Sequence, residues 1–129
     1  MRPILSGTAA LAAGLLASSL AWAQAASPAA VGDTAKGKVL TNSAGMTLYT
    51  FDRDAAGKSN CTAACAQNWP PLTAAASAQS SGDWSVVARE DGGKQWAYKG
   101  KPLYTWSKDT KKGDVTGDGV NNVWHLAMP

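Results

Sequence analysis

The sequence has few of the side chains that build most protein cores. Leu, Ile, Val and Phe make up 13 of the 106 residues after Ala23, and Ile is absent from that stretch. Such depletion indicates a disordered chain only when the net charge is also high and aromatic residues are few. Neither condition holds, because the formal net charge is +3 and the chain has six Trp, three Tyr and one Phe. We therefore expect an ordered domain with an aromatic core.

Charge is also scarce. Charged residues make up 16% of the chain, and a net charge of +3 is too small to indicate binding to nucleic acid or to an anionic membrane. The longest apolar stretch is too short to span a membrane. The sequence names no partner, and we expect neither a nucleic-acid partner nor a transmembrane segment.

The first 23 residues have the pattern of a secretory signal peptide. Met1 and Arg2 give a positive start, residues 11–20 are mostly apolar, and the small-x-small triplet 21–23 predicts cleavage after Ala23. The predicted location is exported, in the bacterial periplasm or secreted, where cysteines are oxidised. No Cys lies near the predicted cleavage site, so we expect no lipid anchor. Residues 24–36 are rich in Ala and are predicted to be flexible.

A duplicated segment organises the rest of the chain. Residues 44–58 align with residues 99–113 at a constant offset of 55. Self-similarity of this kind indicates two copies of one structural unit. We place repeat one at residues 37–72, a linker at 73–83 and repeat two at 84–129. The matched pairs are Gly45/Gly100, Leu48/Leu103, Tyr49/Tyr104, Thr50/Thr105, Phe51/Trp106, Asp54/Asp109 and Trp69/Trp124.

Turn residues divide both repeats into short predicted strands. The predicted fold is a small single all-β domain of two pseudo-symmetric β-hairpin or meander repeats, with one short helical turn near the cysteines. The helical composition is confined to residues 61–68, and Pro70 and Pro71 end that segment. The predicted strands cover residues 38–41 and 46–51 in repeat one, and 84–89, 95–98, 102–106 and 122–127 in repeat two.

Each repeat carries the motif Tyr-x-aromatic-x-x-Asp. Two rings two positions apart share one face of a strand, and an Asp at the strand's end accepts hydrogen bonds from the following turn. The favoured interpretation is structural, with the rings in the core and the Asp fixing the turn. In the functional alternative, both tyrosines and both aspartates face a shared cleft. The motif residues are Tyr49, Phe51 and Asp54 in repeat one, and Tyr104, Trp106 and Asp109 in repeat two.

Four segments together resemble a known family. They read LYTFDRD, CTAACAQNWPPL, PLYTWSKD and GDGVNNVWHLA, and they fall within residues 37–127. The chain resembles the bacterial secreted-repeat family, predicted lipoproteins named for the Y-x-[FWY]-x-x-D motif. The resemblance implies an exported protein built from repeats, and it implies no particular biochemical activity. The missing lipid-acceptor Cys departs from the lipoprotein pattern.

Cys61 and Cys65 are the only cysteines. On a helix, residues four apart lie about 6 Å from each other at Cα, which allows a disulfide. Because the closed loop is short, that disulfide would add only about 2 kcal/mol. The alternative is a copper or thiol-redox site in which Cys61, Cys65 and the single imidazole of His125 bind Cu(I), with Met46 or Met128 as a further ligand.

Two other patterns resemble binding sites, one for calcium and one for glycans. Asp114, Thr116 and Asp118 match the first half of a calcium loop, but His125 stands where the loop needs a bidentate acid. An ordinary Gly/Asp-rich turn explains the same residues. Three tryptophans would bind glycans if at least two of them were exposed and coplanar; they are Trp84, Trp96 and Trp106.

Catalysis is not indicated by the sequence. Hydrolysis needs a positioned acid–base pair. The sequence assigns no catalytic partner to the lone His125 or to the single Glu90. The predicted function is an exported, non-catalytic envelope protein that acts as a binding or accessory module. Copper or redox handling and glycan binding are the alternatives, and an envelope protein or a glycan is the candidate partner. No cofactor is expected unless the copper alternative holds.

Overall fold

The computed structural model describes residues 27–129. The predicted signal peptide, residues 1–23, and the start of the predicted flexible segment, residues 24–26, lie outside the described residues. In the described part, no helix combines the length and apolar character that crossing a membrane requires. The elements are β1 (Ala30–Thr34), β2 (Gly37–Thr41), β3 (Tyr49–Phe51), α2 (Ala64–Asn68), β4 (Trp84–Ala88), β5 (Lys94–Tyr98), β6 (Lys101–Pro102), the 3₁₀ helix η2 (Val120–Asn122) and β7 (Trp124–Leu126).

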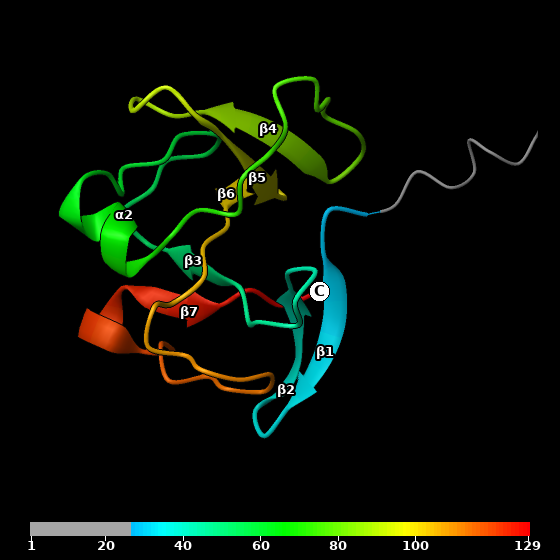
Figure 1. Ribbon diagram of the computed structural model, residues 1–129, viewed down its shortest axis with the longest axis vertical. Helices are drawn as coiled ribbons and strands as arrows, with labels where there is room; N and C mark the ends of the chain where they lie inside the picture. The colour runs from blue at the N-terminus through cyan, green and yellow to red at the C-terminus, as the bar shows by residue number, and fades with distance from the viewer. Residues whose placement is uncertain (1–26) are drawn as a thin grey trace, which may run out of the picture.

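The strands form three small antiparallel sheets. β1 pairs with β2, β3 pairs with β7, and β5 lies between β4 and β6. Figure 1 shows β4, β5 and β6 in the upper half of the molecule, and β1, β2, β3 and β7 in the lower half. The fold is all-β and repeated, with its short helix α2 beside the cysteines, and the predicted fold class is confirmed.

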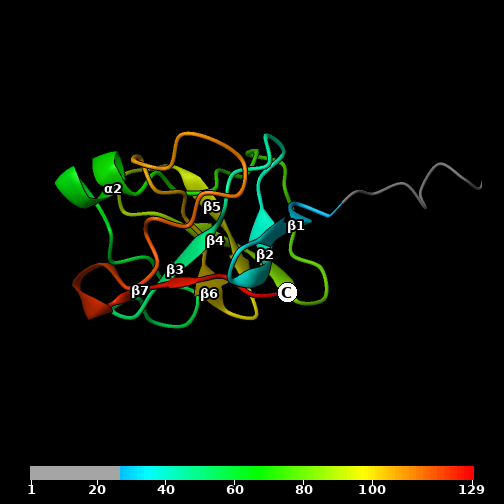
Figure 2. The ribbon, with the colours of Figure 1, turned by 90° about the horizontal axis from the view of Figure 1, so that it is seen from below.

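Each repeat completes the strand pairing of the other. β7 comes from repeat two but pairs with β3 of repeat one, and both ribbon views show these strands side by side (Figures 1 and 2). Residues 70–73 of repeat one lie against repeat two, where the Leu72 amide donates to the Leu103 carbonyl oxygen at 2.9 Å. Tyr49 and Tyr104 exchange backbone N–H···O bonds of 2.7 and 3.0 Å. A pseudo-twofold axis therefore passes between the two tyrosines.

The N-terminal segment differs from the sequence prediction. Residues 24–36 are predicted to be flexible, yet β1 pairs along its whole length with β2. The hydroxyl of Thr34 closes the connecting turn: it donates to the Gly37 carbonyl oxygen at 2.8 Å and accepts from the Lys36 amide at 3.1 Å. Gly37 takes the φ of +106° that ends this two-residue turn. Composition alone hid this hairpin, and repeat one begins near residue 30.

Three predicted strands are shorter than expected, and of the segment 122–127 only Trp124–Leu126 form a strand, because Asn122 belongs to η2. In the segment 46–51, Thr47 forms a single bridge with Thr41, and only the last three residues form β3, which pairs with β7. In the segment 102–106, β6 ends at Pro102 and Tyr104 forms isolated bridges. The chain leaves one sheet and joins the other in both places, so neither segment stays in one ladder.

A continuous stack of aromatic rings forms the main core, and the predicted aromatic core is confirmed. The stack runs through Trp106, Trp69, Trp124 and Phe51, with centroid separations of 3.9, 3.7 and 4.2 Å. The outer rings, Trp106 and Phe51, each lie on the Trp of the other repeat. Tyr49 meets Trp69 edge-on at 5.4 Å, and Tyr104 meets Trp124 edge-on at 5.2 Å. Both tyrosines are fully buried.

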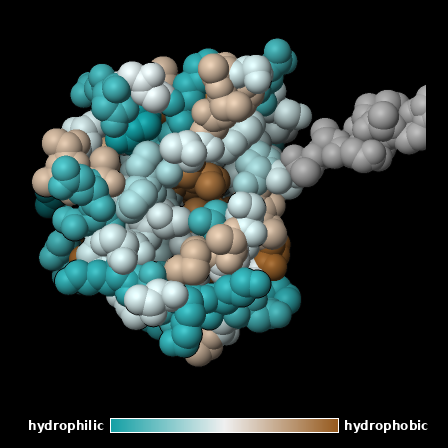
Figure 3. All heavy atoms as spheres, viewed as in Figure 1, coloured by the Kyte–Doolittle hydropathy of each residue, from teal (hydrophilic) through white to brown (hydrophobic). Residues whose placement is uncertain are grey.

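Gly117 lets the stack close. A Cβ at this position would lie 2.8 Å from the Trp69 ring and 3.0 Å from the Trp106 ring, so any larger residue would displace an indole. A smaller aliphatic cluster, built around Leu48 and its equivalent Leu103, fills the other part of the core. On the face drawn in Figure 3, strongly hydrophobic atoms are confined to a recess near the middle and to a spot beside β1.

Candidate functional site

The tyrosines and aspartates of the repeated motif bind each other across the two repeats. The Tyr49 hydroxyl donates to Asp109 Oδ2 at 2.6 Å, and the Tyr104 hydroxyl donates to Asp54 Oδ2 at 2.6 Å. Asp54 Oδ1 accepts the Asn60 amide at 2.7 Å, as the interpretation of the motif as a turn lock predicts. Each motif is therefore completed by a residue of the other copy.

Burial governs the ionisation of these groups. It raises the pKa of Tyr49 and of Tyr104 far above the ordinary tyrosine value, and the hydrogen bonds to Asp109 and Asp54 add to the effect. Burial also raises the pKa of Asp54, although hydrogen bonds from Tyr104 and Asn60 oppose it. Both tyrosines therefore remain protonated donors at neutral pH.

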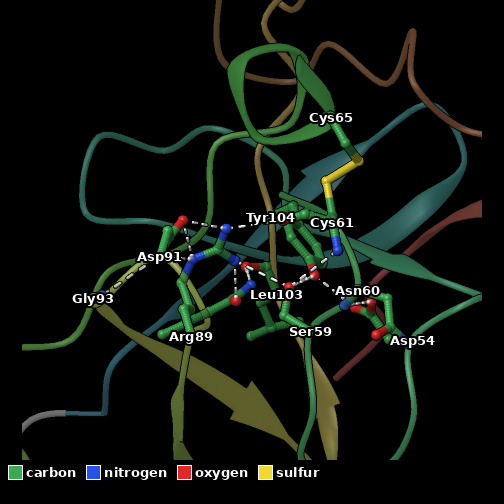
Figure 4. A network of polar contacts seen from close by, with 11 residues as sticks. Asp54, Ser59, Asn60, Cys61, Cys65, Arg89, Asp91, Gly93, Leu103 and Tyr104 are labelled. Carbon is green, nitrogen blue, oxygen red and sulfur yellow. Dashed lines mark hydrogen bonds and ion pairs between the residues drawn. A yellow bond between two sulfur atoms is a disulfide. The ribbon is translucent and has the colours of Figure 1, made fainter. Parts of the chain in front are cut away.

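Arg89 makes the two Tyr–Asp pairs unequal (Figure 4). Its side chain is 2% exposed and lies next to the Tyr104 pair. It donates to Ser59 Oγ at 3.0 Å, and Ser59 in turn shares a 2.6 Å hydrogen bond with the Tyr104 hydroxyl. Asp91, at 2.9 Å, is its counter-ion, and the hydrogen bonds from Arg89 hold the pKa of Asp91 below its usual range. Further donations reach Gln95 Oε1 and the Cys61 carbonyl oxygen.

This geometry favours the structural interpretation of the motif. Tyr49 and Tyr104 are fully buried and Asp109 is 8% exposed, so these three do not face an open cleft. Asp54 differs, because it also lines a hollow at the surface. Phe51 lines the same hollow with one edge, while Trp106 is half-buried against Trp69.

Two adjoining hollows share Thr50, Lys99 and Lys101, and we call them together the lysine groove. The first has a volume of about 330 Å³ and the second about 200 Å³, so together they reach the usual size of a small-molecule site. The first has a mixed polar and apolar lining, and the lining of the second is more apolar. The first is lined by Thr50, Phe51, Asp52, Asp54, Ala55, Ala56, Lys99, Gly100, Lys101 and Pro102, and the second by Thr50, Tyr98, Lys99, Lys101, Leu103, Leu126, Ala127 and Met128.

The first hollow exists because small residues replace large ones. Ala55, Ala56 and Gly57 align with Thr110, Lys111 and Lys112 of repeat two. Around the pseudo-twofold axis, the stem of Lys112 packs on Gly45, and a Cβ on that glycine would lie 2.8 Å from the stem. In the first hollow, Gly57 reaches Gly100 only through a 2.9 Å backbone hydrogen bond. The equivalent space around Gly45, Thr47 and Lys112 is also a hollow, of about 280 Å³, so the two copies differ in the side chains that line it.

His125 lies at the edge of this region. Its Nε2 is 2.7 Å from Asp52 Oδ2, and both side chains are about half exposed, at 47% and 53%. Asp52 lines the first hollow, and His125 pairs with Thr50 in the register of β3 and β7. The sequence interpretation left the partner of His125 unassigned, and the strand pairing supplies it.

Cys61 and Cys65 form a disulfide, with an S–S distance of 2.03 Å and a Cα–Cα distance of 5.1 Å. The predicted disulfide is thus present, and it joins Cys61, which precedes α2, to Cys65 within α2. The copper alternative is not supported, because the sulfurs bind each other and are not thiolate ligands. His125 is also misplaced for it: Trp124 packs in the core with Cys61, while His125 is on the opposite face of β7.

The calcium-like segment forms a turn. Asp114 Oδ2 accepts the amides of Thr110 and Lys111 at 2.8 and 3.1 Å, and the first of these bonds is the main reason that the pKa of Asp114 falls to about 2. Thr116 donates to Asp109, and Asp118 pairs with Lys36. Residues 27–129 contain no cluster of three or more His, Cys, Asp or Glu side chains placed to hold a metal ion.

The three tryptophans do not form the exposed, coplanar pair of rings that glycan binding requires. Trp84, Trp96 and Trp106 are all half-buried, so the two exposed rings that the glycan alternative requires are not found. Trp84 and Trp96 are also nearly perpendicular, with an interplanar angle of 88°, because each packs against its neighbours in the sheet. They form no flat platform for a sugar.

Sequence reasoning missed Arg89, Asp52, Lys99 and Lys101. For three of them a signal was available in the repeat itself, because the aligned copies differ there. Asp52 aligns with Ser107, and the two lysines align with Ala44 and Met46. No sequence signal marks Arg89 as buried, since two of its buried partners, Ser59 and Cys61, come from a distant turn.

The comparisons with known proteins agree with this architecture. The model of a family described as a secreted repeat of unknown function matches residues 30–73 and again residues 85–128. The two matched ranges have the same offset of 55 residues, and the first begins at β1. No curated protein and no solved structure matches the chain.

Proposed function

This chain belongs to the family of secreted repeats of unknown function, and from that premise we propose that it is a non-catalytic binding module of the bacterial envelope, in the periplasm or secreted. The proposal goes beyond the family, which specifies export and repetition and no role. Its ligand site is the lysine groove, and the rest of the molecule is a rigid frame around it.

The frame supports a non-catalytic role because its reactive side chains bond to one another. The motif tyrosines donate to buried or half-buried carboxylates, and the cysteines are joined in a disulfide. His125 bonds to Asp52 at the surface. A catalytic site needs a nucleophile or acid–base pair presented to substrate, whereas these groups hold one another in place.

One observation carries the proposal: the aligned copies place different side chains around the first hollow and around its equivalent. A structural repeat needs only the shared residues, and the equivalent hollow is lined by Gly45, Thr47 and Lys112. The first hollow is lined instead by Asp52 of repeat one and by Lys99 and Lys101 of repeat two. A concave site with a few polar groups at its edge is the usual form of a small-molecule site.

Native mass spectrometry of protein purified from the envelope tests the proposal. Ala56→Trp fills the first hollow, because Ala56 lines it and is exposed. Lys111→Trp places the same indole at the equivalent position of the other repeat and serves as the control. We expect a small-molecule adduct on the wild type and on Lys111→Trp, and its loss on Ala56→Trp. Equal spectra for all three proteins would refute the groove as the binding site.

A further inference from the structure

We infer that the lysine groove binds a single-chain anionic amphiphile, with its carboxylate or phosphate head beside Lys99 and Lys101 and its alkyl chain in the second hollow. This inference rests on the proposed function, because it names the ligand class of the same groove. It follows from four features of the groove: its free cations, its satisfied carboxylates, its apolar half and its asymmetry between the repeats.

The two lysines are available to a ligand. Among residues 27–129, neither Lys99 nor Lys101 forms a salt bridge, whereas Lys36, Lys38, Lys58 and Lys111 each have a carboxylate partner. Both line both hollows. Two lysines that line the same two hollows favour an anion there, and a carboxylate or phosphate head would offset part or all of their positive charge.

Lys99 is held in place by its backbone and by an aromatic ring. Its φ of +51° is unusual for a residue with a side chain, and its amide donates to the Asp83 carbonyl oxygen at 2.7 Å. Its Nζ lies 5.2 Å from the centroid of the Tyr98 ring, which lines the second hollow. The ammonium is therefore located beside an aromatic ring that lines the second hollow.

The carboxylates of the groove do not compete for these cations. Both oxygens of Asp54 already accept hydrogen bonds, from the Tyr104 hydroxyl and the Asn60 amide. Asp52 bonds to His125 at 2.7 Å. Neither Asp52 nor Asp54 is therefore paired with Lys99 or Lys101, and the two lysines are left for a ligand.

The second hollow is suited to an alkyl chain. Leu126 and Tyr98 are half-buried in its wall, and Met128 is 51% exposed. In the described part of the chain, only Val31 and Met128 are large apolar residues with high exposure. An alkyl chain in this hollow would cover the Met128 side chain and remove further apolar surface from water.

The other repeat lacks the same chemistry. At the positions of Lys99 and Lys101 it has Ala44 and Met46, and Pro70 stands at the position of His125. Shared residues build the fold in both copies, so these differences are not required by the core. Lys99 and Lys101 line both hollows of the groove, and the second hollow is the more apolar of the two. That division matches a head group and a chain.

The test is a binding series followed by backbone NMR shifts, with each amphiphile kept below its micelle concentration. Sodium hexanoate, octanoate and decanoate vary the chain, decyl phosphate exchanges the head, and 1-decanol and inorganic phosphate supply each half alone. We expect shifts confined to residues 50–56, 98–103 and 126–128. Affinity should rise roughly tenfold for each added pair of methylenes that the groove buries, and comparing decanoate with decyl phosphate identifies the preferred head.

Lysine variants test the head group. Lys101→Met introduces the residue of the other repeat and should weaken decanoate binding about fivefold, as expected for loss of a partly exposed ion pair. Lys108→Met, at an exposed lysine that lines neither hollow, is the matched control and should bind like the wild type. Binding of 1-decanol as tight as that of decanoate, or an equal loss in both variants, would overturn the inference.

The experiments distinguish a wrong ligand class from a wrong binding role. If the amphiphiles do not bind but the native adduct is still lost on Ala56→Trp, the ligand class is wrong and the binding role stands. If the amphiphiles do not bind and no adduct depends on Ala56, both proposals are refuted.

Discussion

Tyr49 of the first repeat donates its hydroxyl hydrogen to Asp109 of the second, across 2.6 Å and 60 residues of sequence. Tyr104 and Asp54 form the reciprocal bond, also at 2.6 Å. A motif that looks self-contained in each copy is thus completed only by the other copy. Because such buried bonds are costly to leave unmade, the exchange ties the folding of one repeat to the folding of the other.

Replacing Arg89 with Met should strongly destabilise the protein. The change leaves Ser59, Gln95 and the Cys61 carbonyl without their buried donor. We expect a loss of about 2–4 kcal/mol in the free energy of unfolding, measured by urea denaturation.

The matched control is Lys58→Met, which breaks the exposed ion pair between Lys58 and Glu90. An exposed pair is worth at most about 1 kcal/mol. If both variants lose the same free energy, the buried network around Arg89 does not stabilise the fold as described.

The free energy of unfolding lost when a ring is truncated should depend on the position of that ring in the stack. Trp69 lies between two rings and is 4% exposed, so Trp69→Ala should cost about 3–5 kcal/mol. Phe51 ends the stack and is half-buried, so Phe51→Ala should cost less, about 2 kcal/mol. Thermal and urea unfolding measure both. An equal or reversed order would contradict a stack centred on Trp69 and Trp124.

The fold was predictable where local signals coincide with the repeat. The offset of 55 and the ring pairs identified two copies and an aromatic core, because equal segments fold alike. The sequence could not predict that β7 and residues 70–73 each pair with the other repeat, because both copies have the same strand pattern. The β1 hairpin was missed because Thr34 closes its turn through a side chain, which composition does not reveal.

Reducing the disulfide should have a modest effect. It closes a loop with a sequence separation of 4, so its loss should lower the free energy of unfolding by about 2 kcal/mol. Urea unfolding with and without reductant measures this, and Cys61→Ala/Cys65→Ala controls for reagent effects. We also expect the reduced protein to bind Cu(I) no more tightly than a competing chelator, because His125 is on the other face of β7. Tighter binding would revive the copper alternative.

Alkaline pH should weaken the fold through the buried tyrosines. Their pKa is raised in the folded state, so the unfolded chain releases these protons first, near the ordinary value of 10. The stabilisation is complete below about pH 10 and declines as the pH rises further. Urea titrations from pH 8 to pH 11 measure it. Tyr104→Phe should flatten the decline, and an unchanged slope would contradict burial as the cause.

Acid pH should act through Asp114 in the opposite sense. Its pKa falls to about 2 in the folded state, chiefly through the Thr110 amide. Its contribution to stability is present above the ordinary value near 3.9 and is lost as the pH falls toward 2. Asp114→Asn should remove that part of the acid dependence. An identical acid profile in the variant would contradict the hydrogen bonds assigned to Asp114.

The groove was harder to predict than the motif. The sequence drew attention to what the copies share, and the shared residues turned out to be structural. Asp52, Lys99 and Lys101 come from separate turns, and only the tertiary fold brings them to one hollow. The difference between the aligned copies was a usable signal, but the meaning of small residues at 55–57 depends on knowing that Lys112, the equivalent of Gly57, packs on Gly45.

The most direct test of the exchanged pairing is a pair of double-mutant cycles. The account predicts a coupling of about 1.5–3 kcal/mol between Tyr49→Phe and Asp109→Asn, which lie in different repeats. It predicts less than about 0.5 kcal/mol between Tyr49→Phe and Asp54→Asn, which share one motif. Strong coupling within the motif and none across the repeats would contradict it.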